Sequence, residues 1–240
     1  MTGRVRIPHW KRWLSIGVVV VALALVGGPY VYIHFIEGAA PAALSLATPA
    51  TTSTSGATAS PTQSGDASDG IWNVSSGSLV GYRVKEVLFG QSNVAVGRTS
   101  EVSGSITVTG TTIDTGTFTV DMVTVASDQS RRDGQFNGRI METSTYPTAT
   151  FTLTKPITLG SIPAQGTQRT YEATGNLTLH GVTKAVTFKV NGRYSGSTFQ
   201  VAGSIPITFA DWSIPNPSFG PVSTEDHGVL EFALNFAQAA

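Results

Sequence analysis

The chain has 240 residues, with 15 basic and 15 acidic side chains, zero formal net charge and no cysteine. The absence of cysteine excludes disulfides, thiolate metal sites, a cysteine nucleophile and the acylated cysteine of a lipoprotein. The charge stays close to neutral from Ile71 onward, without the cluster of lysine and arginine that a nucleic-acid partner requires, so we expect no such partner.

The N-terminal residues predict a membrane anchor. Residues 1–13 are basic and contain no acid, and residues 14–36 contain no charged side chain. At about 1.5 Å per residue, a helix over residues 14–36 would span roughly 34 Å, enough for a hydrocarbon core of about 30 Å. The positive-inside preference puts residues 1–13 in the cytoplasm and everything after Glu37 outside. A cleaved signal peptide is the alternative, and it too would export the rest of the chain.

Residues 37–70 predict a disordered linker. They are mostly alanine, serine, threonine, proline and glycine, with no aromatic side chain. Such a segment cannot bury enough apolar surface to offset the entropy lost on ordering. As a random coil of about 33 residues, it would have an end-to-end distance of roughly 30 Å. We therefore expect the following domain to be held near the membrane on a flexible stalk.

Residues 71–240 alternate apolar and polar side chains with a period of two, the pattern of half-buried strands. In one clear example, Val186, Phe188 and Val190 alternate with polar residues. About eight such stretches occur, rich in threonine and in β-branched or aromatic residues. Turn residues separate several of them, Asn191-Gly192 among others. The regular spacing favours an all-β, antiparallel up-and-down barrel or a sandwich.

Residues 127–142 lack this alternation and predict a short helical connection across one end of the barrel. Ser127 or Asp128 is the expected N-cap. Arg132 and Asp133 could close the barrel end or orient the headgroup of a ligand. The simpler interpretation is an ion pair that fixes the helical connection to a neighbouring loop.

Two motifs occur in an order and spacing that are specific in combination. The first consists of Phe118-Thr-Val-Asp-Met122, Arg132-Asp133 and Tyr146-Pro-Thr-Ala-Thr-Phe151, and the second is Gly175-Asn-Leu-Thr-Leu-His-Gly-Val-Thr-Lys184. Together they resemble the signatures of the YceI-like family, and the resemblance covers residues 71–236. It implies an eight-stranded, lipocalin-like barrel, typically exported, whose interior binds a long polyisoprenoid chain or a quinone-type tail. The sequence departs from the family at Val74-Ser75, where an acid is common, and at residues 210–220, which are bulkier and richer in proline.

A barrel of eight strands is either filled by its own side chains or holds one small ligand. The inward positions expected here are apolar and often aromatic, and the family resemblance favours a cavity. An isoprenoid tail would gain about 0.8 kcal/mol for each CH₂ that it buries there. We expect no cofactor other than a bound polyisoprenoid or quinone lipid. The predicted ligand-binding residues are Tyr82, Val84, Phe118, Met122, Arg132, Phe151, Phe188, Phe209, Trp212 and Phe232.

The sequence argues against an enzyme. Ser223, Asp226 and His227 lie close together, but no strained nucleophile turn surrounds the serine. His180 is expected to hydrogen-bond backbone in a turn between two strands. Trp212 and Phe219, in a proline-rich loop, could form a lid, a membrane-facing patch or packing over an open end. The predicted function is a tethered lipid-binding protein; the alternatives are an enzyme acting on an isoprenoid lipid, and a stalked stress or adhesion domain with a filled core.

Overall fold

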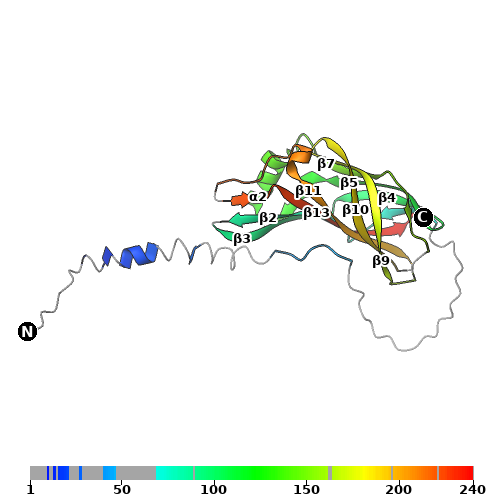
Figure 1. Cartoon of the computed structure of the whole chain (residues 1–240), viewed down its shortest axis with the longest axis horizontal. Coiled ribbons are helices and arrows are strands. Elements are labelled where there is room, and N and C mark those ends of the chain that lie inside the picture. The colour runs from blue at the N-terminus through cyan, green and yellow to red at the C-terminus, as the bar shows by residue number, and fades with distance from the viewer. Residues whose placement is uncertain are drawn as a thin grey trace, which may run out of the picture.

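The structure, a computed structural model, is built almost entirely from antiparallel strands that roll into a barrel (Figure 1). It describes residues 10, 13–14, 16–21, 27–28, 40–46, 69–88, 90–161, 164–195, 197–220 and 222–239. The strands are β1 (Gly70–Val74), β2 (Leu79–Leu88), β3 (Gln91–Thr99), β4 (Val102–Thr109), β5 (Thr112–Asp121), β6 (Ala126–Ser127), β7 (Thr148–Leu153), β8 (Ile157–Thr158), β9 (Gln168–Leu179), β10 (Val182–Tyr194), β11 (Thr198–Thr208), β12 (Val222–Thr224) and β13 (His227–Gln238). The helical elements are η2 (Met122–Thr124), α2 (Ser130–Gln135), η3 (Phe136–Ile140) and η4 (Phe209–Trp212).

Eight of these strands close into a ring. Each pairs with the next in the order β1, β4, β5, β7, β9, β10, β11 and β13, and β13 pairs back to β1. Every one of these pairings is antiparallel. Closure leaves no unpaired edge in the ring, which is how a barrel satisfies its backbone groups. The predicted eight-stranded antiparallel barrel is confirmed.

The hairpin of β2 and β3 extends the wall at one end. β2 pairs with the first half of β13 through Val229 to Ala233, whereas β1 pairs with its last residues. The tip of the hairpin is flanked by β12, and β6 pairs with β3. The sequence did not predict β3, because Asn93, Ala95 and Gly97 weaken its apolar alternation. Its pairing with β2 along its whole length stabilises it instead.

The predicted helical connection over residues 127–142 is confirmed, as α2 followed by the π-helix η3. The predicted N-cap was wrong: the N-cap is Gln129, and its side chain makes no capping hydrogen bond. The carboxylate of Asp133 accepts hydrogen bonds from both the amide (2.8 Å) and the hydroxyl (2.6 Å) of Ser127. Because Ser127 belongs to β6 and Asp133 to α2, these two bonds hold the helix against the strand.

Two clusters of buried apolar side chains support the barrel. The larger one surrounds the interior near α2 and η4, and the smaller one packs around Trp72, which is 1% exposed. The ring of Trp72 meets that of Phe199 edge-on, with 4.5 Å between centroids, and Tyr194 packs beside them. Because β13 runs from η4 towards this cluster, the two clusters occupy opposite ends of the barrel.

The N-terminal region is described only in part. Most of the expected anchor over residues 14–36 and most of the expected linker over residues 37–70 lie outside the described residues. Within the described part of the chain, no helix has the length and apolar character needed to cross a membrane. In the range expected to be a flexible stalk, residues 40–46 instead lie against the outer wall of the barrel, where Leu44 donates its amide to Glu231.

Candidate functional site

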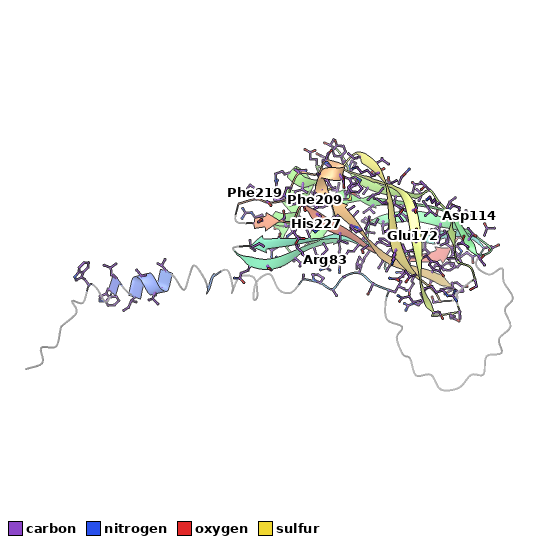
Figure 2. All side chains as sticks on the ribbon, in the orientation of Figure 1. Arg83, Asp114, Glu172, Phe209, Phe219 and His227 are labelled. Atoms are coloured by element: carbon purple, nitrogen blue, oxygen red, sulfur yellow. The ribbon has the colours of Figure 1, made fainter. Side chains whose placement is uncertain are left out.

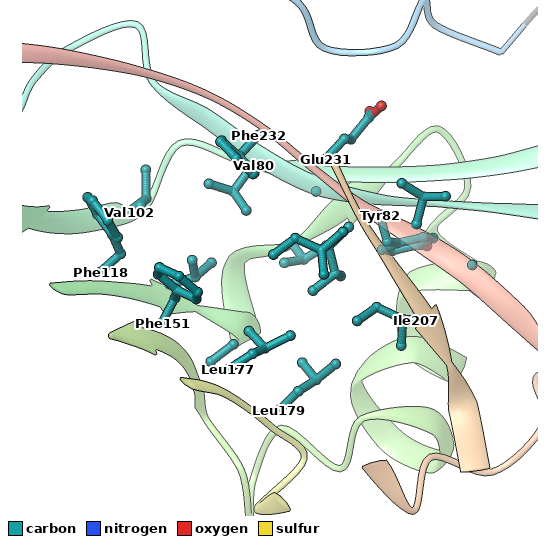
Figure 3. Close-up of a pocket in the computed structure, with 18 of the residues that line it drawn as sticks. Val80, Tyr82, Val102, Phe118, Phe151, Leu177, Leu179, Ile207, Glu231 and Phe232 are labelled. Atoms are coloured by element: carbon teal, nitrogen blue, oxygen red, sulfur yellow. The ribbon is translucent and has the colours of Figure 1, made fainter. Parts of the chain in front are cut away.

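The barrel is hollow. Its interior holds a cavity of about 840 Å³, within the range of small-molecule sites in proteins. Figure 3 shows apolar side chains from several strands converging on this space, among them Phe118, Leu177 and Ile207. The lining draws on every strand of the closed ring except β1, together with β2 and β3. The interior therefore has the size and chemistry for an apolar ligand, and the hypothesis of a filled core is wrong.

The structure brings together nine of the ten predicted ligand-binding residues on the wall of this cavity. The exception is Trp212, which belongs to η4 and is 4% exposed but does not line the space. Its ring packs into the larger core cluster, and Lys184 Nζ lies 5.7 Å from the ring centroid. The predicted residues that line the cavity are Tyr82, Val84, Phe118, Met122, Arg132, Phe151, Phe188, Phe209 and Phe232.

Sequence reasoning missed much of the aliphatic lining. Ala173, Leu177 and Leu179 line the cavity from β9, and Ile205 and Ile207 do so from β11. Each of these residues stands an even number of positions from its neighbours, so the period of two placed them all on one face of their strand. Assigning every second residue of each strand to the interior would have found them. They were missed because the prediction selected mainly aromatic side chains.

Glycines in the neighbouring strands seat several of the aromatic rings against the barrel wall. A Cβ on Gly175 would lie 2.3 Å from the ring of Phe151, and one on Gly203 would lie 2.7 Å from the ring of Phe232. The rings thus occupy room that a side chain on the next strand would otherwise take. Because they lie along the wall, they contribute apolar surface without filling the centre of the cavity.

The cavity is polar at the end next to α2. There Arg132 Nη2 donates to Glu86 Oε1 at 3.2 Å, and the same guanidinium binds Asp128. This supports the simpler interpretation of Arg132, an ion pair that fixes the helical connection, although its partners are Glu86 and Asp128 and not Asp133. Burial raises the pKa of Tyr82 well above its ordinary value, while Arg132 acts in the opposite direction. Its hydroxyl therefore stays protonated and available as a hydrogen-bond donor.

Exposed residues mark this end as the mouth. Arg131 and Phe219 both line the cavity, and both are exposed to solvent. Phe219 is 53% exposed (Figure 2), and the guanidinium carbon of Arg139 lies 5.8 Å from its ring centroid. The loop that carries Phe219 is tied down further by Arg139, which donates to the carbonyls of Asn216 and Pro217. Phe219, rather than Trp212, is therefore the aromatic residue of this loop at the opening.

The imidazole rings of the two histidines in the barrel contact a backbone carbonyl or carboxylates. His180 takes a positive φ of 49° and precedes Gly181, so the two residues form the tight turn of the β9–β10 hairpin. His180 Nδ1 lies 3.3 Å from the carbonyl of Trp212 in η4, so its backbone partner belongs to a distant element and not, as predicted, to its own turn. Both ring nitrogens of His227 face carboxylates, those of Asp226 and Glu225. Neither arrangement holds a serine next to a free imidazole nitrogen.

A closed antiparallel barrel with a large, mainly apolar interior and a polar mouth next to α2 defines a lipid-binding barrel. The model of the YceI-like domain family matches residues 72–236, and the chain belongs to that family. No curated protein matches the chain.

Among solved structures, a polyisoprenoid binding domain from Saccharophagus degradans, implicated in plant cell wall breakdown, is similar in fold. It is 21% identical, with a TM-score of 0.58, and the match covers 70% of this chain and 98% of that one. BcnA from Burkholderia cenocepacia is 23% identical with a TM-score of 0.49, covering 64% of this chain and 95% of that one. A YceI protein from Campylobacter jejuni is 16% identical with a TM-score of 0.43, covering 57% of this chain and 83% of that one.

Proposed function

We propose that this protein is a membrane-tethered, extracytoplasmic carrier that holds a polyisoprenoid or isoprenoid-quinone-type lipid inside its barrel. The observation that carries the proposal is the apolar cavity of about 840 Å³, which opens at a polar mouth. An elongated lipid would place its tail among the aromatic and aliphatic side chains. Membership of the YceI-like family and the fold shared with a polyisoprenoid binding domain support this choice of ligand class.

The two parts of the cavity suit the two parts of such a lipid. The apolar wall contributes through area alone, about 0.8 kcal/mol for each buried CH₂, so an isoprenoid tail needs no polar contact to bind tightly. At the mouth, Arg132 and the protonated hydroxyl of Tyr82 lie where a polar headgroup would emerge. The headgroup thus keeps access to water while the tail is shielded from it.

The membrane tether rests on the sequence. The uncharged run of residues 14–36, preceded by basic residues, is long enough to span a bilayer with the barrel on the outer side. A carrier held at that surface would take up a lipid that the bilayer itself supplies.

Native mass spectrometry of the full chain, extracted in mild detergent, tests the carrier function. We expect a co-purifying apolar molecule that organic extraction releases and that chemical analysis identifies as an isoprenoid. A chain that is repeatedly recovered empty, and that does not take up an added polyprenol, would refute the proposal. Accessibility of an introduced cysteine to a membrane-impermeant reagent in intact cells tests the location of the barrel independently.

A further inference from the structure

The outer wall of the barrel carries a buried carboxylate. Glu231 lies on β13 and borders the cavity together with residues 230, 232 and 234, but Figure 3 shows its side chain pointing away from the apolar lining. Its side chain is nevertheless only 3% exposed. A charged group buried on an outer surface must be paired and covered, because desolvation of an isolated carboxylate is costly.

Two arginines pair with this carboxylate. Arg83 Nε lies 3.3 Å from Glu231 Oε2, and Arg98 Nη2 lies 2.7 Å from Glu231 Oε1. Arg98 belongs to β3, so its side chain must cross β2 to reach β13. Gly81 stands directly between them in register, and a Cβ there would lie 2.8 Å from Cγ of Arg98. The missing side chain at Gly81 is what lets the arginine cross.

The covering segment is residues 40–46 of the chain itself. Leu44 donates its amide to Glu231 Oε2 at 3.2 Å, Arg83 donates to the carbonyl of Pro41 at 2.6 Å, and Arg98 donates to the carbonyl of Ala42. All three bonds involve the backbone of the segment. The charge cluster of Arg83, Arg98 and Glu231 therefore binds a peptide main chain. The two arginines donate to its carbonyls, and the carboxylate accepts from its amide.

The direction of the segment relates it to the mouth. Ala40 and Pro41 share a small surface hollow with residues of β3 and with Asp128 and Arg132, next to α2. Leu44 lies further from the mouth, at Glu231. The segment therefore enters at the mouth end and runs away from it along the wall.

We infer that docking of residues 40–46 onto Arg83, Arg98 and Glu231 holds the barrel with its mouth towards the membrane. This inference rests on the proposed tether. Between the end of the uncharged run at residue 36 and Ala40 there are four Cα–Cα steps, which reach at most about 14 Å. An undocked linker would instead allow separations of roughly 30 Å in any orientation. The docked barrel can thus exchange lipid with the bilayer directly beneath its opening.

The docking is tested by a distance measurement on the full chain in nanodiscs. Because the chain has no cysteine, spin labels can be placed uniquely with Ala43→Cys and Ser92→Cys, both at exposed positions. We expect a single narrow distance distribution. Leu44→Pro removes the amide that binds Glu231 without touching the barrel, and it should spread the distribution over roughly 30 Å. A broad distribution in the parent chain, or a narrow one that survives Leu44→Pro, would overturn the docking.

The orientation is tested with fluorescent labels and lipids that carry a quencher in the headgroup region. Ser223→Cys places the label on β12 at the mouth, and Thr111→Cys places it in the β4–β5 turn at the opposite end. We expect stronger quenching at position 223, and loss of this difference on Leu44→Pro. Gln165→Pro, in a loop far from the mouth, is the control for an added proline and should retain the difference.

The outcomes separate this inference from the function on which it rests. Equal quenching at the two positions in the parent chain overturns the orientation. A chain that does not float with vesicles overturns the tether and the orientation together, whereas the spin-label distance decides the docking by itself. An empty barrel in mass spectrometry refutes lipid carriage and changes neither the distance nor the quenching.

Discussion

Ala173 lies on β9 with its side chain facing the cavity, and it is 3% exposed. We expect Ala173→Phe to have opposite effects on the empty and the loaded protein. In the empty barrel the new ring enters free space, so the free energy of unfolding should rise by up to about 1.5–3 kcal/mol through burial of the ring. In the loaded barrel the ring takes the place of about six lipid carbons, which costs about 5 kcal/mol, or roughly a four-thousandfold rise in Kd.

Two measurements check this prediction. Thermal unfolding of delipidated protein gives the stability, and titration with a polyprenol followed by native mass spectrometry gives the affinity. Ala185→Phe is the matched control, because Ala185 lies on β10 with its side chain exposed on the outer face. It should change neither quantity appreciably. If Ala173→Phe instead destabilises the empty protein by about 1–3 kcal/mol, as overpacking of a filled core does, the reasoning from a hollow barrel is wrong.

Three further predictions follow from individual residues. Gly175→Ala should lower the free energy of unfolding by about 1–3 kcal/mol in urea denaturation, because its Cβ would lie 2.4 Å from a backbone oxygen of β7. Gly134→Ala is the control and should not destabilise, because its Cβ would meet no atom within 4 Å. Burial in the folded protein raises the pKa of Tyr82, so the stability that the protonated tyrosine contributes is complete below a pH of about 10 and is lost as the pH rises above it. In equilibrium unfolding, Tyr82→Phe should reduce this loss at alkaline pH. An unchanged slope of the unfolding free energy against pH would contradict the assignment. The hydrogen bond from His227 lowers the pKa of Asp226, so an NMR titration should show that pKa rising towards its ordinary value in His227→Ala.

The alternation of side chains predicted the barrel because a strand in a closed sheet has one face inside and one outside. Phe151, Phe188 and Phe232 could therefore be assigned to the interior from the sequence. The same pattern failed where glycines and small polar residues interrupt it. Asn191-Gly192 was expected to be a turn, but β10 continues through both residues, because β9 and β11 pair with it on either side.

Trp212 shows a second limit of sequence reasoning. A tryptophan in a proline-rich loop left a lid, a membrane-facing patch and packing over an open end as alternatives, and the structure places its ring within the larger core cluster. Its neighbour in the loop, Phe219, reaches the mouth instead. The sequence placed both aromatics near one end of the barrel, but which of them faces the opening depends on the turn of η4, where Ser213 takes a positive φ of 56°.

The sequence by itself determined the strands, the antiparallel class, the helical connection and the apolar character of the interior, because these follow from local side-chain periodicity and from motifs within single stretches. Only the tertiary structure decided that the interior is hollow. The volume of the cavity depends on how aromatic rings pack against glycines of other strands, which lie far away in the sequence. The tertiary structure also decided the outer charge cluster: Arg83 and Glu231 lie 148 positions apart, and their ion pair exists because β2 and β13 are neighbours in the closed wall.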